Sequence, residues 1–276
     1  MNSFFFDTNY ETILKRTKVT KIALKEVNKK ALIKLNEEDI LNVLNLLKPS
    51  RVRVGFLDFK IVYKLSDDLE LGEIVDITKK FVCNHVFLNI PTFNDFEEEK
   101  ALLAEKLDEI IKFFKREKIK VSFHLDYQIN SAITAYLITK IKELNFIFDS
   151  AKCFKHQKSI STYYRLIKER INVLIVNDLT NKNEPTLLLQ GKGQIKEMSE
   201  RLKFENYKGD VIYDFNLLDY LENRKKIYKK RFPLFKGKSF DNYLAIEERL
   251  GLTKESDLAY ENLFINQFNL LDHLFK

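Results

Sequence analysis

The sequence contains no tryptophan, only two cysteines in 276 residues, and no long apolar run. Without tryptophan, the hydrophobic core must rely on the 23 phenylalanines together with leucine and isoleucine. Cys83 and Cys153 form neither a CxxC pair nor a disulfide framework, so a reducing cytoplasm is the expected location. No apolar stretch approaches the roughly 20 residues that span a bilayer, and residues 1–10 lack the pattern of a signal peptide. We therefore expect a cytoplasmic protein with no membrane partner.

The charge balance is basic, with a net charge of +7 and a pI near 9.1. Lysine is interleaved with glutamate and aspartate along most of the chain, which is typical of solvated helix faces. The one concentrated basic run covers residues 224–231 and is followed by Lys236 and Lys238. Because most of the charge is dispersed, nucleic acid is not the expected partner; salt-dependent DNA binding would be the sign of one.

Short β-rich apolar runs alternate with longer amphipathic runs, which predicts βα units around a parallel sheet. The predicted strands cover residues 3–6, 20–27, 52–59, 85–90, 120–126, 146–149, 171–177 and 209–215. The predicted helices cover residues 10–16, 37–47, 71–80, 96–116, 131–144, 161–170 and 196–203. Eight strands predict a single α/β domain, a (βα)8 TIM barrel, because such a barrel needs roughly 250 residues.

The barrel is predicted to occupy residues 1–225, and residues 226–276 are predicted to form a C-terminal helical extension. Phe264, Phe268, Leu271 and Phe275 recur at helical spacing and make an apolar stripe. Such a stripe has to be covered, either by the barrel or by a second subunit in a homodimer.

Polar side chains end the predicted strands, where an α/β barrel builds its active site. The last four strands close with pairs of such residues: His124 and Asp126, Asp149 and Lys152, Asn177 and Asp178, and Asp214 and Asn216. The earlier strands offer Glu26 and Asn28, Asp58 and Lys60, and Asn89 and Thr92. His85 begins its strand, so it lies at the opposite rim and is expected to be structural.

Five segments in a fixed order resemble the xylose isomerase-like barrel superfamily, which includes sugar-phosphate isomerases and epimerases, inosose dehydratase-type enzymes and endonuclease IV relatives. The segments are residues 104–126, 144–152, 170–178, 189–195 and 207–214, within a resemblance that covers residues 3–216. The resemblance implies a TIM barrel that acts on a sugar or sugar phosphate. The implied chemistry is isomerisation or epimerisation by proton transfer next to a carbonyl.

The resemblance also implies a metal site, and this chain departs from it. Family enzymes hold a divalent metal with Glu, Asp, His and Glu from strands five to eight, and the matching positions here are His124, Asp149, Ile175 and Asp214. Asp149 matches the family's Asp, Asp214 is a shorter carboxylate in place of Glu, and His124 replaces the other Glu. At the fourth position Ile175 replaces the His, so that ligand is lost. The three polar residues remain candidate ligands for Mn²⁺, Zn²⁺ or Mg²⁺, with water or Asn177 completing the shell.

Lys152 stands where the family has a histidine that touches substrate, and it favours an arrangement without metal. Asp149, Lys152 and Asp214 would then pair with one another across the rim. Lys152 could also bind a phosphate or carboxylate, or form a Schiff base. Lys192, in the Gly191-Lys192-Gly193 loop, could share an anion with it.

The sequence leaves three functions open. The first is a sugar isomerase or epimerase with Asp214, Lys152 and His124 as catalytic residues; its substrate-binding candidates are Asp126, Asn177, Lys192, Glu26 and Asn89. The second is a non-catalytic barrel that binds a ligand or partner and has lost its metal. The third is an endonuclease IV-like repair enzyme, which needs several metals and many histidines, whereas this chain has four.

Overall fold

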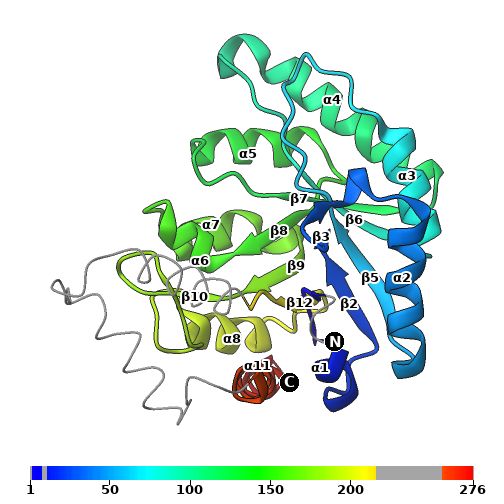
Figure 1. Ribbon diagram of the computed structural model, residues 1–276. Coiled ribbons are helices and arrows are strands. Elements are labelled where there is room, and N and C mark those ends of the chain that lie inside the picture. The colour runs from blue at the N-terminus through cyan, green and yellow to red at the C-terminus, as the bar shows by residue number, and fades with distance from the viewer. Residues whose placement is uncertain (1, 8–10, 216–256, 276) are drawn as a thin grey trace, which may run out of the picture.

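The computed structural model describes residues 2–7, 11–215 and 257–275. Its main sheet has eight parallel strands in the order β1-β12-β9-β8-β7-β6-β5-β2. The strands are β1 (Asn2–Phe4), β2 (Lys21–Leu24), β5 (Arg53–Asp58), β6 (His85–Asn89), β7 (Lys120–His124), β8 (Phe146–Asp149), β9 (Ile171–Val176) and β12 (Asp210–Tyr213). A bridge between Phe5 and Ala23 brings the β1 and β2 edges together, and the Phe6 amide donates to the Ala23 carbonyl oxygen at 2.9 Å. The predicted TIM barrel is confirmed (Figure 1).

Helices surround this sheet. They are α1 (Glu11–Arg16), α2 (Glu37–Leu47), α3 (Leu71–Lys80), α4 (Phe96–Arg116), α5 (Ser131–Lys140), α6 (Ser150–Lys155), α7 (Ile160–Ile167), α8 (Ile195–Phe204) and α11 (Asp257–Phe275), with 3-10 turns at Leu32–Lys34, Lys48–Ser50 and Lys168–Arg170. The bounds of α2, α3, α4 and β8 match the prediction. Clear caps explain two of these: Asn36 and Asp39 form a capping box at α2, and the Asp95 carboxylate accepts from the first amides of α4. No helix in the described ranges is long and apolar enough to cross a membrane.

The barrel interior is a packed core. Eight inward side chains fill its middle: Phe5, Ala23, Phe56, Phe87, Ile147, Val173, Ile175 and Ile212. The large apolar residues of opposite parity face the helices and join the main core. Polar pairs lie at both ends of this filled layer, Asp58 with His124 at one end and Lys21 with Asp210 at the other.

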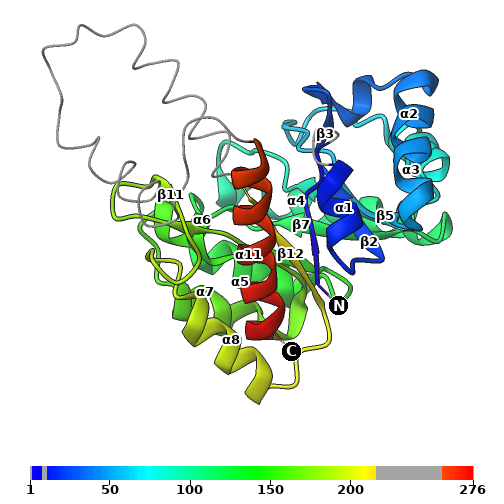
Figure 2. The ribbon, with the colours of Figure 1, turned by 60° about the horizontal axis from the view of Figure 1, so that its bottom comes forward.

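The C-terminal apolar stripe packs on the barrel. Phe264 and Phe268 both meet the Phe4 ring edge to face, at centroid distances of 5.0 and 5.3 Å. Gln267 accepts a hydrogen bond from the Leu188 amide at 2.7 Å. Figures 1 and 2 both show α11 between α8 and α1. The homodimer stays a prediction. Three other predicted features lie outside the described residues: the domain boundary between 225 and 226, the basic run and Asn216.

The end of the second strand differs from the prediction. β2 stops at Leu24, and the chain turns back in a small antiparallel hairpin of β3 (Glu26–Val27) and β4 (Lys30–Ala31). Asn28 and Lys29 have φ angles of 50° and 64°, the two positive values that a tight hairpin turn requires. A second small hairpin pairs β10 (Asp178–Leu179) with β11 (Pro185–Thr186).

Helix α6 was not predicted. Asp149 caps it, because its side chain accepts from the Lys152 amide and starts a helix directly at the end of β8. Lys152 therefore lies in the first turn of a helix and not on a strand. Similarly, β7 ends at His124, and Asp126 lies in the turn that follows.

Candidate active site

Asp58 and His124 form a buried pair at the C-terminal rim. Asp58 ends β5 and His124 ends β7, and His124 Nε2 lies 2.9 Å from Asp58 Oδ1. The two side chains are 1% and 13% exposed, in that order. Burial raises the pKa of Asp58, but the interaction with His124, together with the charges of Lys60 and Lys25, outweighs burial, so the pKa lies below its usual value. The carboxylate is therefore ionised and holds the imidazole in a fixed orientation.

Lys25 and Asp214 form a second pair at the same rim. Lys25 follows β2 and Asp214 follows β12, and Lys25 Nζ lies 2.9 Å from Asp214 Oδ1. Both side chains are mostly buried, at 23% and 20% exposed. The ammonium also lies over the Phe5 ring, 5.2 Å from its centroid. A positive charge is thus fixed at the mouth of the barrel, above the packed interior.

Asp149 is the third rim carboxylate. Asn177 donates to its Oδ2 at 3.3 Å, the Lys152 amide donates to its Oδ1 at 2.8 Å, and its own amide donates to the Tyr127 hydroxyl at 3.0 Å. Burial, with a contribution from the charge of Asp214, raises the pKa of Asp149. The rim therefore holds one carboxyl whose pKa is raised and one, Asp58, whose pKa is lowered, which is a pattern seen in acid–base sites.

These side chains do not fit a divalent metal as they are arranged. His124 is bonded to Asp58, Asp214 to Lys25, and Asp149 to Asn177 and an amide. Ile175, which the resemblance aligns with a histidine ligand, is a buried aliphatic side chain. Within the part of the chain that the structure describes, no three His, Cys, Asp or Glu residues form a group that could hold a metal ion. The predicted ligand set would require these pairs to open.

The predicted pairing of Lys152 across the rim is wrong, since the partner of Asp214 is Lys25. The Lys152 ammonium makes no ion pair with any of the described carboxylates, although its charge lowers the pKa of Asp149 against the effect of burial. Lys152 is half-buried in the first turn of α6. It is available to contact an anionic ligand.

The Gly191-Lys192-Gly193 loop is filled by a carboxylate of the chain itself. Asp178 accepts from the amides of Gly191 at 2.9 Å, Gly193 at 2.8 Å and Leu179 at 3.0 Å. A Cβ on residue 191 would lie 2.2 Å from Asp178 Oδ1, which explains the glycine. These two glycine amides are therefore occupied, and Lys192 presents an exposed side chain while its own amide donates to Leu179.

The remaining predicted substrate residues have different surroundings. Asn89 donates to the Ile61 carbonyl at 3.0 Å and thereby anchors the loop after β5. Asp126 accepts from the Gln128 amide at 2.8 Å. Glu26 is exposed on the hairpin, where it lines a cavity of about 30 Å³ together with Lys25 and Asp214.

Sequence reasoning missed Lys25 because it followed the wrong parity of the second strand. Ile22 and Leu24 are the large residues of that strand, and they face the helices. The inward residues are Lys21, Ala23 and Lys25, with Ala23 in the interior core. A small residue between two lysines is the signal that could have shown the inward face.

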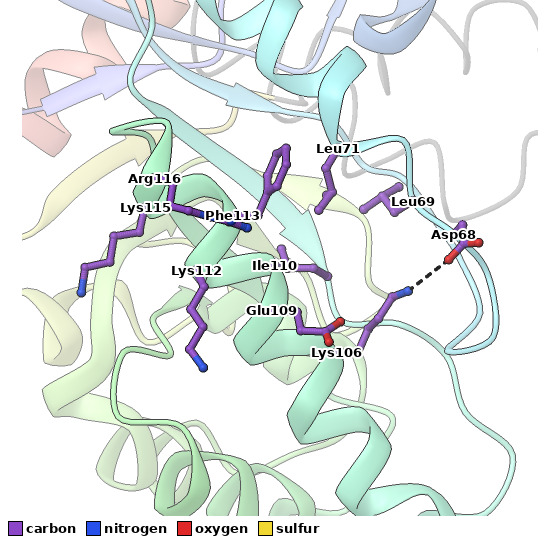
Figure 3. A pocket seen from close by; sticks show the side chains of 10 residues that line it. All are labelled: Asp68, Leu69, Leu71, Lys106, Glu109, Ile110, Lys112, Phe113, Lys115 and Arg116. Carbon is purple, nitrogen blue, oxygen red and sulfur yellow. Dashed lines mark ion pairs between the residues drawn. The ribbon is translucent and has the colours of Figure 1, made fainter.

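A cavity of about 900 Å³ lies away from the rim on the outer surface (Figure 3). It is lined by the segment around Leu69 and by one side of α4. Lys106 reaches across it to Asp68, with a distance of 3.7 Å between the charged atoms. Its lining comes from a helix face and a loop, so the rim, where the strands end, is the better candidate for chemistry.

No protein-family model and no curated protein matches the sequence. Solved structures do share its fold. A D-psicose 3-epimerase from Clostridium cellulolyticum H10 is 9% identical with a TM-score of 0.64, over 100% of this chain and 99% of that one. A xylose isomerase domain protein from Planctomyces limnophilus is 10% identical with a TM-score of 0.63, over 91% and 98%. A probable 3-DHS dehydratase from Bacillus anthracis is 13% identical with a TM-score of 0.57, over 82% and 94%. At these identities the likeness is one of fold, and it agrees with the TIM barrel seen in the structure.

Proposed function

We propose that this protein is a sugar or sugar-phosphate isomerase or epimerase that moves a proton next to a carbonyl at the C-terminal rim. The observation that carries the proposal is the buried Asp58–His124 pair among the rim carboxylates. A carboxylate that accepts one ring N–H leaves the other nitrogen of a neutral imidazole as a base. Two structures with this fold are named as sugar epimerases, D-psicose 3-epimerase and 3-keto-D-glucoside 4-epimerase, which fits such an activity.

Each rim residue has a role in this proposal. His124 removes the proton from the carbon beside the carbonyl, and the electron pair moves to the carbonyl oxygen to form an enediolate. The protonated His124 then returns the proton to the same or the neighbouring carbon, and the Asp214 carboxylate passes the hydroxyl proton from one substrate oxygen to the other. Lys152, which makes no ion pair with a described carboxylate, binds the anionic end of a sugar phosphate. Asn177 and the more peripheral Asp126, Asn89, Glu26 and Lys192 would contact hydroxyl groups.

The test is solvent exchange at the reacting carbon. The protein is incubated in D₂O with a panel of ketohexoses, aldoses and their phosphates, and deuterium incorporation is followed by NMR. We expect incorporation by the wild type and a loss of about 100-fold or more in His124→Gln, the range of a general base. Asp210→Asn, at the opposite end of the same strand as Asp214, is the matched control and should retain the rate. Exchange that is unchanged in His124→Gln would contradict the proposal.

A binding barrel without catalysis is the second candidate, and the existing partners of all the rim carboxylates favour it. In that case sugars or sugar phosphates from the same panel would raise the melting temperature without any deuterium incorporation.

A further inference from the structure

We propose that the Lys25 ammonium takes the place of a divalent metal at this rim, so that the site holds the substrate's oxyanion without a metal ion. The choice of oxyanion rests on the proposed function, whereas the exclusion of metal can be tested without it. The sequence analysis did not single out Lys25, and its role follows from where the folded chain places its charge.

The position of the charge is the first argument. The ammonium lies 2.9 Å from Asp214 Oδ1, the carboxylate expected to bind a metal, and over the ring of Phe5. Its side chain is only 23% exposed, so the charge is held inside the mouth of the barrel. A divalent ion approaching Asp214 would meet a fixed positive charge at contact distance, in surroundings that screen it poorly.

The other potential ligands give a second, independent argument. Asp58 occupies Nε2 of His124, and Asn177 together with the Lys152 amide occupies the two oxygens of Asp149. A metal would have to displace each of these bonds, and Ile175 would offer nothing in return. Rim charges are thus already balanced by the chain's own cation and hydrogen bonds.

Lys25 suits this role better than Lys152. Lys25 reaches the rim from the end of a barrel strand and contacts a carboxylate there. Lys152 contacts that region through its backbone amide, in the first turn of α6. An ammonium carries three N–H donors in a flexible arrangement, so it can hold Asp214 and a substrate oxygen at the same time.

The consequence for the reaction is charge stabilisation by the protein itself. When the base takes the proton from carbon, the electron pair moves to the carbonyl oxygen, and the resulting enediolate oxygen is negative. A cation beside that oxygen stabilises it. Lys25 would supply this charge, and the proton would return to carbon as the carbonyl re-forms, so no metal and no redox partner enters the step.

The fold contains a matched control for Lys25. Lys21 and Asp210 form the same kind of ion pair on the same two strands, at the opposite end of the barrel, with the Lys21 ammonium over the Phe56 ring. Replacing Lys21 therefore removes an equivalent charge and an equivalent pair without touching the rim.

The experiment is a Mn²⁺ titration followed by the electron paramagnetic resonance signal of the free ion. It compares the wild type, Lys25→Met and Lys21→Met. We expect the wild type and Lys21→Met to show no saturable binding, and Lys25→Met to show saturable binding, because Asp214 and Asp149 lose their neighbouring cation. Saturable binding by the wild type, or the same affinity in Lys25→Met and wild type, would overturn the proposal. If Lys25→Met does not fold, Lys25→Gln replaces it, since glutamine keeps a donor without the charge.

Deuterium exchange in the presence of EDTA gives the second readout. The wild type and Lys21→Met should keep their rates in the chelator, and Lys25→Met should lose about 100-fold. A wild-type rate that EDTA abolishes and Mn²⁺ restores would overturn the proposal. If no sugar of the panel exchanges at all, the proposed reaction fails, and the Mn²⁺ titration still decides whether Lys25 excludes metal.

Discussion

His124 Nε2 and Asp58 Oδ1 lie 2.9 Å apart across the mouth of the barrel, although 66 positions separate the two residues in the chain. Their strands, β7 and β5, are not neighbours, because β6 lies between them. The pair therefore spans the interior over the Phe87 ring, whose centroid is 6.2 Å from that of His124. Such a contact depends on the curvature of the sheet over β5, β6 and β7.

Removing His124 should destabilise the protein more than neutralising Asp58. His124→Leu leaves the buried Asp58 carboxylate without its hydrogen-bond partner, at an expected cost of about 3–5 kcal/mol. Asp58→Asn removes the charge but keeps a polar neighbour for the imidazole, at about 1–2 kcal/mol. Urea denaturation at pH 7 measures both, and Asp58→Asn/His124→Leu should cost less than the sum. Equal costs for the two single variants would mean that Asp58 is not held as a buried charge.

Acid should destabilise the protein through His85. Burial lowers the pKa of His85 from 6.5 to about 4, where its Nε2 meets the Ser122 hydroxyl at 2.9 Å. Between these two pH values the imidazole binds a proton in the unfolded chain but not in the folded one. The free energy of unfolding therefore falls as the pH drops through this window, and the contribution of His85 is fully present above it. A difference of this size corresponds to about 3 kcal/mol. Chemical denaturation from pH 4 to 8 should show this dependence in the wild type and less of it in His85→Gln; identical profiles would contradict it.

Gly191→Ala should destabilise the fold, because its Cβ would lie 2.2 Å from Asp178 Oδ1 and 2.4 Å from the Leu179 carbonyl oxygen. We expect a cost of about 1–3 kcal/mol, the range for overpacking. Gly72→Ala is the matched control: beyond its chain neighbours and its own helix backbone, no atom lies within 4 Å of the added Cβ. In helix α3 alanine should be neutral or stabilising by up to about 1 kcal/mol. Thermal melting of the two variants tests this difference. A melting temperature lowered equally in Gly191→Ala and Gly72→Ala would contradict the prediction.

Phe264→Ala should loosen the first strand. Phe264 is 1% exposed and contacts Phe4, Tyr213 and Phe215. The expected cost is about 3–5 kcal/mol. Amide hydrogen exchange in β1 should speed up, whereas Asn266→Ala, exposed on the same helix, should leave it unchanged. Unaltered protection of β1 in Phe264→Ala would show that α11 does not hold that strand.

Much of the barrel could be predicted because strands and helices alternate with distinct periods. Helix α4 has a capping aspartate, an apolar face and a basic last turn, and its bounds followed from these local signals. Helix α6 has no such periodicity over its six residues, and it exists because Asp149 caps it. Local sequence patterns therefore predict long helices such as α4 better than short ones such as α6.

Side-chain pairing at the rim could not be predicted to the same degree. Sequence parity placed Asp149 and Asp214 at strand ends, but the partner of Asp214 depends on which face of β2 points inward. A register shift between Ile22 and Ala23, in the pairing with β5, accompanies that choice. The identity of the cation beside Asp214 thus depends on tertiary structure: the inward face of β2 makes it Lys25 and not Lys152.

The packing of α11 against Phe4 has a consequence for synthesis on the ribosome. β1 is translated first among the described strands, and the helix that covers it comes after all the others. A nascent chain can pair β5 through β9 early, but the side of β1 that meets α11 stays uncovered until translation reaches Phe264. The pairing of β1 with β12 is thus the last strand pairing that translation allows, and the outer face of β1 is covered only when α11 follows.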